Sequence, residues 1–294
     1  MRKYFYVLLL VILIAGCPAR KDTMSTTDGL SDATGVVYSG KATDRIISLA
    51  PVLTENLKLM VTLNRLVGRT DYCDTPSQIP SVGNIIEPSI ERIVVLKPDI
   101  VLATKDGNQP AAINKLRELG IKVFVFGESD SWKTVQDNFL LMGKLLGEES
   151  KASVILSELN RQLNATQAKI TGNNHKVFVQ LNNNPLMTAG NNTFINDIIR
   201  HAGCRNIAGD TANKWPVFNI EEVIRRNPDL IIISEMGQMT ATAKEMWQNF
   251  PGIPAVKSGR IYVMPAELMC QPTPANFVKA VQQIIKWLIN TENK

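Results

Sequence analysis

The chain of 294 residues is 45% hydrophobic and 20% charged, which allows one large domain or two lobes with a sizeable core. Its net charge of +5 is mild, and the basic residues form none of the runs that are typical of nucleic-acid binding. The chain has two histidines, and four cysteines without C-x-x-C spacing, which disfavours a protein metal site. We therefore expect no nucleic-acid partner and no metal site.

The N-terminus predicts export. The basic start MRK precedes an apolar run, residues 4–15, that is too short to span a bilayer comfortably as a helix, as in a secretory signal. The following sequence LIAGC resembles the bacterial lipobox, so we predict a lipoprotein signal over residues 1–17 that ends at a lipidated Cys17; the alternative is an ordinary signal peptide. Residues 18–43 are rich in Ser, Thr, Asp and Gly and predict a flexible tether. The protein would lie in the periplasm or at the cell surface, anchored to a membrane.

Residues 44–128 alternate between strand and helix patterns. This alternation predicts an α/β lobe with a largely parallel sheet. We expect strands at residues 45–50, 100–103 and 121–126, helices at 54–66, 89–97 and 111–119, and a polar loop at 68–76.

Residues 129–172 show no strand pattern and predict connecting helices. Two helices are separated by Gly147, and the second has apolar residues at steps of three and four. About 22 helical residues span roughly 33 Å, which is enough to cross a small lobe. We therefore predict a single long, stiff helix that joins two lobes.

Residues 173–294 repeat the strand and helix alternation and predict a second α/β lobe. The expected strands are 176–181, 185–190, 230–234 and 261–264, and the expected helices are 194–201, 243–250 and 274–290.

One segment occurs twice. SIERIVVLKPDIVL at residues 89–102 returns as NIEEVIRRNPDLII at residues 219–232, with a constant offset (221 − 91 = 130). Each copy predicts a short helix that stops before a proline, then an aspartate, then a buried strand. A unit repeated once predicts two similar lobes, each with a glutamate in the same place, Glu91 and Glu221. From the residues alone, the best explanation is that each glutamate stabilises the first turn of its helix. A carboxylate there interacts favourably with the helix dipole, by about 0.3–1 kcal/mol.

The sequence contains no G-x-S-x-G elbow, P-loop, dinucleotide-binding glycine pattern or H-E-x-x-H motif, so we predict no enzyme. Ligands of α/β sheets bind at the carboxyl ends of the strands, and two facing lobes would bring such ends across one cleft. Tyr72 and Trp215 are aromatic residues in such positions, and each could stack on a ligand or simply pack. The segments expected at the cleft are 50–52, 70–74, 104–108, 182–185 and 265–272.

These features together resemble the solute-binding proteins of iron–siderophore and vitamin B12 ABC importers. The motifs that carry the resemblance are RIISLAP at 45–51 with Thr54-Glu55, GRTDY at 68–72, Val82-Gly83, Glu91 with LKPD at 96–99, LGI at 119–121, and Trp215-Pro216 followed by Glu221. The resemblance spans residues 44–290. It implies two Rossmann-like lobes joined by one long helix, of the class III periplasmic-binding-protein type. It also implies no cofactor of the protein's own, and an ABC permease dimer with its ATPase as the partner.

The same resemblance implies roles for individual residues. Glu91 and Glu221 would dock onto arginines of the two permease subunits as charge-assisted pairs. Asp71–Asp74, Trp215-Pro216 and the loop 267–272 are most similar to the vitamin B12-binding branch. The expected cargo is a cobalt corrinoid, with a ferric siderophore as the alternative; haem is less favoured. The ligand-binding residues that this implies are Tyr72, Asp74, Trp215, Glu267, Leu268, Met269, Cys270 and Gln271.

Two questions stay open at this stage. Cys73 and Cys270 could form a disulfide across the lobes, contact the ligand as thiols, or be unrelated, whereas Cys204 behind Gly203 is expected to be structural. An exported hydrolase could use Glu91 and Glu221 as an acid/base pair, but both open helices that are expected on lobe surfaces. A structural lipoprotein would not need two matched α/β lobes.

Overall fold

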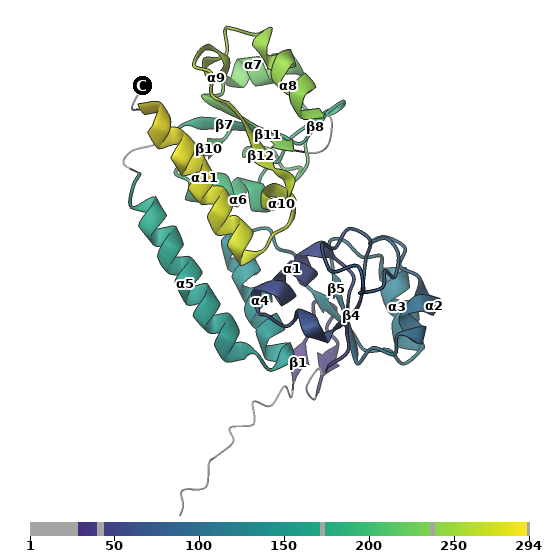
Figure 1. The fold of residues 1–294 in the computed structure, drawn as a ribbon. Coiled ribbons are helices and arrows are strands. Elements are labelled where there is room, and N and C mark those ends of the chain that lie inside the picture. The colour runs from purple at the N-terminus through teal and green to yellow at the C-terminus, as the bar shows by residue number, and fades with distance from the viewer. Residues whose placement is uncertain (1–28, 40–43, 171–173, 236–238, 293–294) are drawn as a thin grey trace, which may run out of the picture.

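A computed structural model of the chain describes residues 29–39, 44–170, 174–235 and 239–292. It contains two α/β lobes that are joined along one side by helices (Figure 1). The predicted signal sequence and Cys17 lie outside the described residues. Within these ranges, no helix combines the length and the apolar character that crossing a membrane requires.

The first lobe is built on a four-stranded parallel sheet of order β4-β3-β5-β6. Along β5, Ile100 and Leu102 enter one core, with α1, and Val101 enters the other, with α2 and α3. Burial on both faces explains why this strand is apolar at nearly every position. The elements are β3 (Ile46–Ser48), β4 (Leu66–Arg69), β5 (Ile100–Thr104), β6 (Val123–Phe126), α1 (Pro51–Leu59), α2 (Ile90–Val95) and α3 (Pro110–Glu118).

The strand β4 corrects the prediction of a helix over 54–66 followed by a loop. The helix α1 ends at Leu59, Val61 adopts a positive φ of 56°, and a 3₁₀ turn (Leu63–Arg65) leads into β4. β4 lies at the edge of its sheet, and its residues are alternately buried and half-buried. A short edge strand of this kind carries little apolar signal, because only one of its faces is fully covered.

The second lobe has the same strand order, β10-β7-β11-β12, again all parallel. The offset of 130 also relates the first residues of β3 and β7 (46 + 130 = 176) and of β5 and β11 (100 + 130 = 230). The repeat therefore extends from the motif to the whole sheet. The elements are β7 (Lys176–Gln180), β10 (Arg205–Asn206), β11 (Leu230–Glu235), β12 (Ile261–Pro265), α6 (Phe194–His201), α7 (Ile220–Arg226), α8 (Met239–Gln248), α9 (Pro254–Lys257), α10 (Ala266–Cys270) and α11 (Pro274–Glu292).

The predicted strand at 185–190 is found only as the two-residue β9 (Leu186–Met187), which pairs antiparallel with β8 (Asn182–Asn183). β10 was not predicted, because two residues are too few to produce a periodic pattern.

Both repeated helices begin and end in the same way. The Ser89 side chain accepts from a backbone N–H at the start of α2, and Asn219 does the same for α7. After the helices, Lys97 and Asn227 adopt positive φ angles of 45° and 56°. This left-handed residue turns the chain into the proline of each copy.

The repeated aspartate has a structural role. Asp99 Oδ2 accepts a hydrogen bond from the backbone N–H of Arg45 at 3.0 Å, and Asp229 Oδ2 accepts one from Lys176 at 2.8 Å. The side chains of Arg45 and Lys176 in turn donate to carbonyls at the ends of α2 and α7. Each aspartate thus fixes the end of its helix to the start of the neighbouring strand. This explains why an aspartate follows the proline in both copies of the repeat.

Two antiparallel helices connect the lobes: α4 (Trp132–Leu146) and α5 (Glu149–Gln167), with Gly147 at a φ of 72° between them. Trp132 stacks on Phe277 of α11 in the second lobe at 4.7 Å, whereas the later residues of α4 are buried in the first lobe. α5 begins in the core of the first lobe, with Ala152, and reaches the second with Leu163. The expected long helix is α5, and α4 adds a second link. Because both are buried in both cores, the connection resists large lobe movements.

Residues 29–39 form a hairpin, β1 (Leu30–Ser31) with β2 (Val37–Tyr38), against the edge of the first lobe. The Asp32 side chain is 0% exposed and forms an ion pair with Arg117 Nη2 at 2.6 Å. The predicted flexible tether over 18–43 is therefore wrong for residues 29–39. The ion pair of Asp32 and the backbone hydrogen bond from Ala33 to Val125 of β6 hold this otherwise polar segment on the first lobe.

Asp32→Asn is expected to destabilise the protein by about 2 kcal/mol, because it weakens hydrogen bonds to a charged group. Burial, the largest single effect, raises the pKa of Asp32, but hydrogen bonds from Thr34, Val125 and Val36 outweigh it and the net pKa is lowered. The stabilisation that ionised Asp32 contributes is thus complete above its ordinary pKa of 3.8. It is lost as the pH falls through the lower pKa that Asp32 has in the folded protein. Urea unfolding between pH 3 and 7 measures both effects.

The control for this variant is Asp137→Asn, which removes an exposed pair with Lys133 on α4. It should change the free energy of unfolding by less than about 1 kcal/mol. Equal effects of the two substitutions would contradict a special role for Asp32.

Candidate functional site

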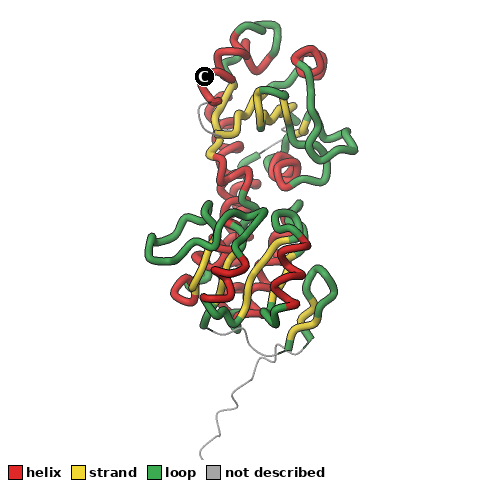
Figure 2. The backbone as a smooth tube through the Cα atoms, turned by 90° about the vertical axis from the view of Figure 1, so that its right-hand side faces the viewer, coloured by secondary structure: helices red, strands yellow, loops and turns green. Residues whose placement is uncertain are grey.

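A cavity of about 860 Å³ lies between the two lobes. In Figure 2 the loops of the lower lobe gather at the edge that faces the upper lobe. The first lobe and the segment leading into α4 contribute Asp106, Ser129 and Asp130. The second lobe contributes a larger, mainly apolar wall: Leu181, Asn182, Met187, Asn192, Thr193, Phe194, Ile195, Lys214, Trp215, Met269, Cys270 and Pro272.

The sheet topology explains this position. In each lobe the chain proceeds from its first strand, β3 or β7, to one side and then to the other, which leaves a crevice at the carboxyl ends of the strands. Asp106 follows β5, Asp130 follows β6 and Asn182 follows β7. The cavity therefore lies at the carboxyl ends of strands in both lobes, where ligands of α/β sheets bind and where the sequence placed it.

Trp215 is held at the cavity by two paired segments, residues 186–190 and 214–218, which we call the ribbon. Backbone N–H groups of Thr188 and Gly190 donate to the carbonyls of Pro216 and Lys214 at 3.0 and 2.8 Å. The Trp215 side chain remains 47% exposed. The ribbon thus presents an aromatic face from a rigid backbone.

A charged group borders the cavity. Lys214 Nζ lies 2.6 Å from Glu128 Oε2 and 3.8 Å from Asp130 Oδ2, and Lys105 Nζ lies 3.6 Å from Glu128 Oε1. The hydrogen bond with Lys214 lowers the pKa of Glu128, and the same bond raises the pKa of Lys214. Burial raises the pKa of Asp106, and the charge of Glu128 adds to this. Three carboxylates therefore lie on this side with two ammonium groups, of which Lys214 is the one that comes from the second lobe.

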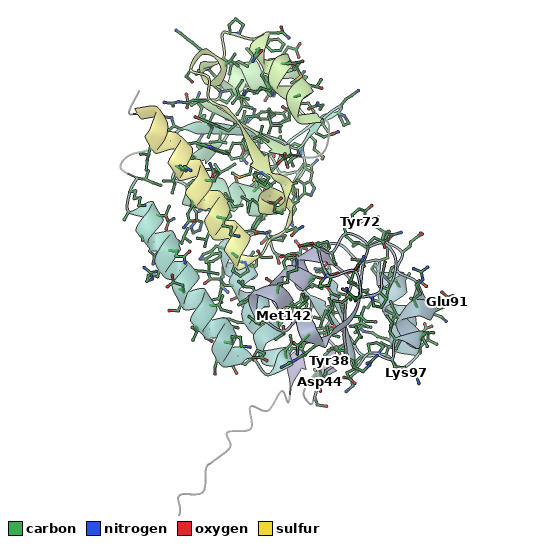
Figure 3. The ribbon with its side chains drawn as sticks, in the orientation of Figure 1. Tyr38, Asp44, Tyr72, Glu91, Lys97 and Met142 are labelled. Atoms are coloured by element: carbon green, nitrogen blue, oxygen red, sulfur yellow. The ribbon has the colours of Figure 1, made fainter. Side chains whose placement is uncertain are left out.

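Of the expected ligand-binding residues, Trp215, Met269 and Cys270 come together at the cavity. Tyr72 is 72% exposed on the side of the first lobe that faces the second, but it does not line the cavity (Figure 3). Asp74 does not line it either, and forms an ion pair with Lys58 of α1 at 2.7 Å.

Glu267, Leu268 and Gln271 do not line the cavity, because most of the expected loop is the helix α10. Leu268 packs against the second-lobe core. The carbonyls of Glu267 and Gln271 accept hydrogen bonds from Asn276 of α11. A helix turns consecutive side chains to different sides, so only part of this segment can face a ligand.

Several residues that line the cavity were not expected from the sequence. Asp106 and Asn182 lie in strand-end segments that were expected at the cleft, but Ser129, Asp130 and Lys214 do not. The last three lie in connections whose course depends on how the lobes pack. No local pattern in the sequence marks them.

The three cysteines within the described residues, Cys73, Cys204 and Cys270, are free thiols, so the structure does not contain the cross-lobe disulfide. Cys73 is 5% exposed and accepts a hydrogen bond from Thr54 Oγ1 at 3.1 Å inside the first lobe. Cys270 lines the cavity, and burial raises the pKa of its thiol. Cys204 is buried, as expected for a structural residue. Burial raises the pKa of its thiol to about 12.

Glu91 and Glu221 are exposed in the first turns of α2 and α7. Figure 3 shows Glu91 at the outer surface of the first lobe. Both helices cover the sheet faces that are turned away from α4, α5 and α11. Carboxylates on the outer faces of different lobes cannot act on one substrate, which contradicts the acid/base hypothesis.

Neither histidine lines the cavity. His175 precedes β7, and His201 ends α6 and packs edge-on against Phe277. In the described parts of the chain, no group of three or more His, Cys, Asp or Glu side chains could hold a metal ion.

A family profile described as periplasmic binding protein matches residues 44–268. The uncharacterized ABC transporter substrate-binding lipoprotein YvrC of Bacillus subtilis is 26% identical over 299 aligned positions, covering 95% of this chain and 93% of that protein. The crystal structure of the periplasmic vitamin B12 binding protein BtuF of Vibrio cholerae has a TM-score of 0.74 at 25% identity, covering 87% of this chain and 100% of that one. The periplasmic heme binding protein HutB of Vibrio cholerae has a TM-score of 0.75 at 22% identity, covering 83% and 98%. Proteins named for different ligands are equally similar in fold, so fold alone does not identify the ligand.

Proposed function

The chain belongs to the periplasmic binding protein family, and from this premise we propose that it captures a bulky metal chelate between its lobes and delivers it to an ABC permease dimer with its ATPase. The observation that carries this proposal is the cavity of about 860 Å³ at the facing strand ends of the two lobes. That volume is in the upper part of the range for small-molecule sites. The protein acts by binding and release and catalyses no reaction.

The preferred cargo is cobalamin or a related corrinoid. The mainly apolar wall with Trp215 and Met269 suits the face of a flat macrocycle, and Asn182 and Asn192 can bond to amide groups at its rim. The similarity to a vitamin B12 binding protein supports this choice. The alternative is a ferric siderophore. Haem is less favoured, since no histidine lines the cavity to bind its iron.

The proposal includes a membrane anchor and a docking surface. We propose that Cys17 is lipidated and holds the exported protein at a membrane, which the lipobox-like sequence and the lipoprotein relative support. Metabolic labelling with palmitate tests this. We propose that Glu91 and Glu221, exposed on matching helices, contact arginines of the two permease subunits.

Calorimetric titration with cyanocobalamin, cobinamide, ferrichrome, ferric enterobactin and haem tests the cargo. We expect a corrinoid to bind most tightly. Trp215→Ala should weaken its binding about tenfold or more, because it removes an aromatic anchor from the cavity. Trp287→Phe, in a tryptophan that stacks on Tyr262 away from the cavity, is the control and should bind normally. Tighter binding of a siderophore would replace the corrinoid, and no binding of any of these chelates would refute the proposal.

A further inference from the structure

The ribbon that carries Trp215 belongs to the second lobe, but one of its side chains reaches to the first. We infer that Lys214 is a positioning residue: its ion pair with Glu128 holds the ribbon, and with it Trp215, at a fixed distance from the opposite wall of the cavity. The inference rests on the proposed function, because it assigns a role within the same cavity.

The position of the two residues makes the pair a link between lobes. Glu128 comes two residues after β6 ends at Phe126, so it is fixed to the first-lobe sheet. Lys214 is fixed to the second lobe, because its carbonyl accepts the Gly190 N–H at 2.8 Å. Its Nζ lies 2.6 Å from Glu128 Oε2. The aromatic anchor is the next residue in the chain, so a shift of Lys214 moves Trp215.

The surroundings make this lysine difficult to replace. Lys214 and Glu128 are 40% and 38% exposed, and an isolated pair of this kind typically changes an equilibrium by no more than about fivefold. Here the ammonium also lies 3.8 Å from Asp130, and Asp106 lines the same side of the cavity. Without Lys214, Glu128 would keep only its longer pair with Lys105 of the same lobe. The three carboxylates would then face the second lobe without a counter-charge from that lobe. We therefore expect a larger effect, about tenfold.

The chain offers a matched control. Lys105 also pairs with Glu128, at 3.6 Å, but it follows β5 in the first lobe and does not connect the lobes. It does not line the cavity. If the effect of Lys214 were only general charge neutralisation, removal of either lysine would have a similar result. If it is positioning across the cavity, only Lys214 matters.

The experiment compares Lys214→Met, Lys214→Arg, Lys105→Met and Glu128→Gln by two measurements. The first needs no ligand: acrylamide quenching of Trp215 fluorescence, with Trp215→Phe as the blank for the other tryptophans. The second is the dissociation rate of cyanocobalamin. We expect Lys214→Met to raise quenching about twofold and dissociation about tenfold, in each case less so in 1 M salt. Lys214→Arg should keep the quenching and the dissociation rate close to those of the unmodified protein, and Lys105→Met should leave both quantities unchanged.

The double variant Lys214→Met/Glu128→Gln tests the pair directly. Its effect should be clearly smaller than the two single effects combined, because both substitutions break the same interaction. Additive effects, equal effects of the two lysines, or unchanged quenching in Lys214→Met would overturn the inference. Because quenching is measured without ligand, a failure of cyanocobalamin to bind would count against the proposed cargo and leave the test of Lys214 intact.

Discussion

Replacing both Glu91 and Glu221 by alanine is expected to abolish import while cargo affinity stays unchanged. Each carboxylate is exposed in the first turn of its helix, α2 or α7, outside the cavity. A charge-assisted hydrogen bond contributes about 1.5–3 kcal/mol, so losing both should weaken permease binding at least about a hundredfold. Uptake of labelled cargo by whole cells and calorimetry on the purified protein separate the two properties. Each single variant should lose part of the activity, since the two sites act together.

Glu222→Ala and Glu118→Ala are the matched controls. Glu222 is adjacent to Glu221 on the same helix, but it already forms ion pairs with Arg225 and Arg226. Glu118 is an exposed carboxylate at the end of α3. Both variants should transport normally. Loss of cargo affinity in the double variant, or equal loss of transport in the controls, would contradict the docking assignment.

Gly190→Ala is expected to destabilise the protein by about 3 kcal/mol and to weaken cargo binding at least tenfold. A Cβ at Gly190 would lie far inside 3.0 Å of the Asn213 carbonyl oxygen and of Thr211 Oγ1. The clash involves backbone, so the ribbon must separate, which adds lost hydrogen bonds to the cost of overpacking. Lys214 and Trp215 would move with it. Thermal unfolding should show a fall in Tm of roughly 10 °C, and calorimetry should show the loss of affinity.

The control is Gly252→Ala in the same lobe. A Cβ there meets no atom within 4 Å, and the residue does not have a positive φ. Its free energy of unfolding should change by less than about 1 kcal/mol, with normal cargo affinity. If Gly190→Ala behaves like Gly252→Ala, the ribbon is not the rigid support that the structure indicates.

Much of the fold could be predicted because its signals are local. Strands such as Ile100–Thr104 are apolar at nearly every position, since helices cover both faces of a parallel sheet. The repeat predicted two matching lobes, and the sheets have the same strand order. The proline and aspartate of each copy are explained by the turn and the backbone hydrogen bond that Asp99 and Asp229 accept.

The less accurate predictions have a common physical cause. The edge strand Leu66–Arg69 is too short and too little covered to show a pattern. Residues 29–39 appeared too polar to fold, yet the Asp32–Arg117 ion pair and hydrogen bonds with Val125 hold them on the first lobe. In both cases the stabilising contact comes from residues distant in the chain, which local composition does not report.

The candidate site divides in the same way. The rule that ligands bind at the carboxyl ends of strands named the segments that contain Asp106 and Asn182, and Trp215 was expected at the cleft as an aromatic residue that could stack on a ligand. The loop 267–272 was expected to face the ligand throughout, but most of it is the helix α10, and of its residues Met269, Cys270 and Pro272 line the cavity. The helix is one and a half turns long, too short for a periodic pattern to predict it.

The sequence by itself determined the fold class, the two matched lobes, the family and the exposed glutamates, because each depends on residues close together in the chain. Only the tertiary structure decided which side chains share the cavity, that α4 as well as α5 is buried in both cores, and that Lys214 meets Glu128. Lys214 and Glu128, for example, are 86 residues apart in the chain. A contact at that separation forms only when the cores of both lobes have fixed the positions of their loops, so no local sequence pattern can report it.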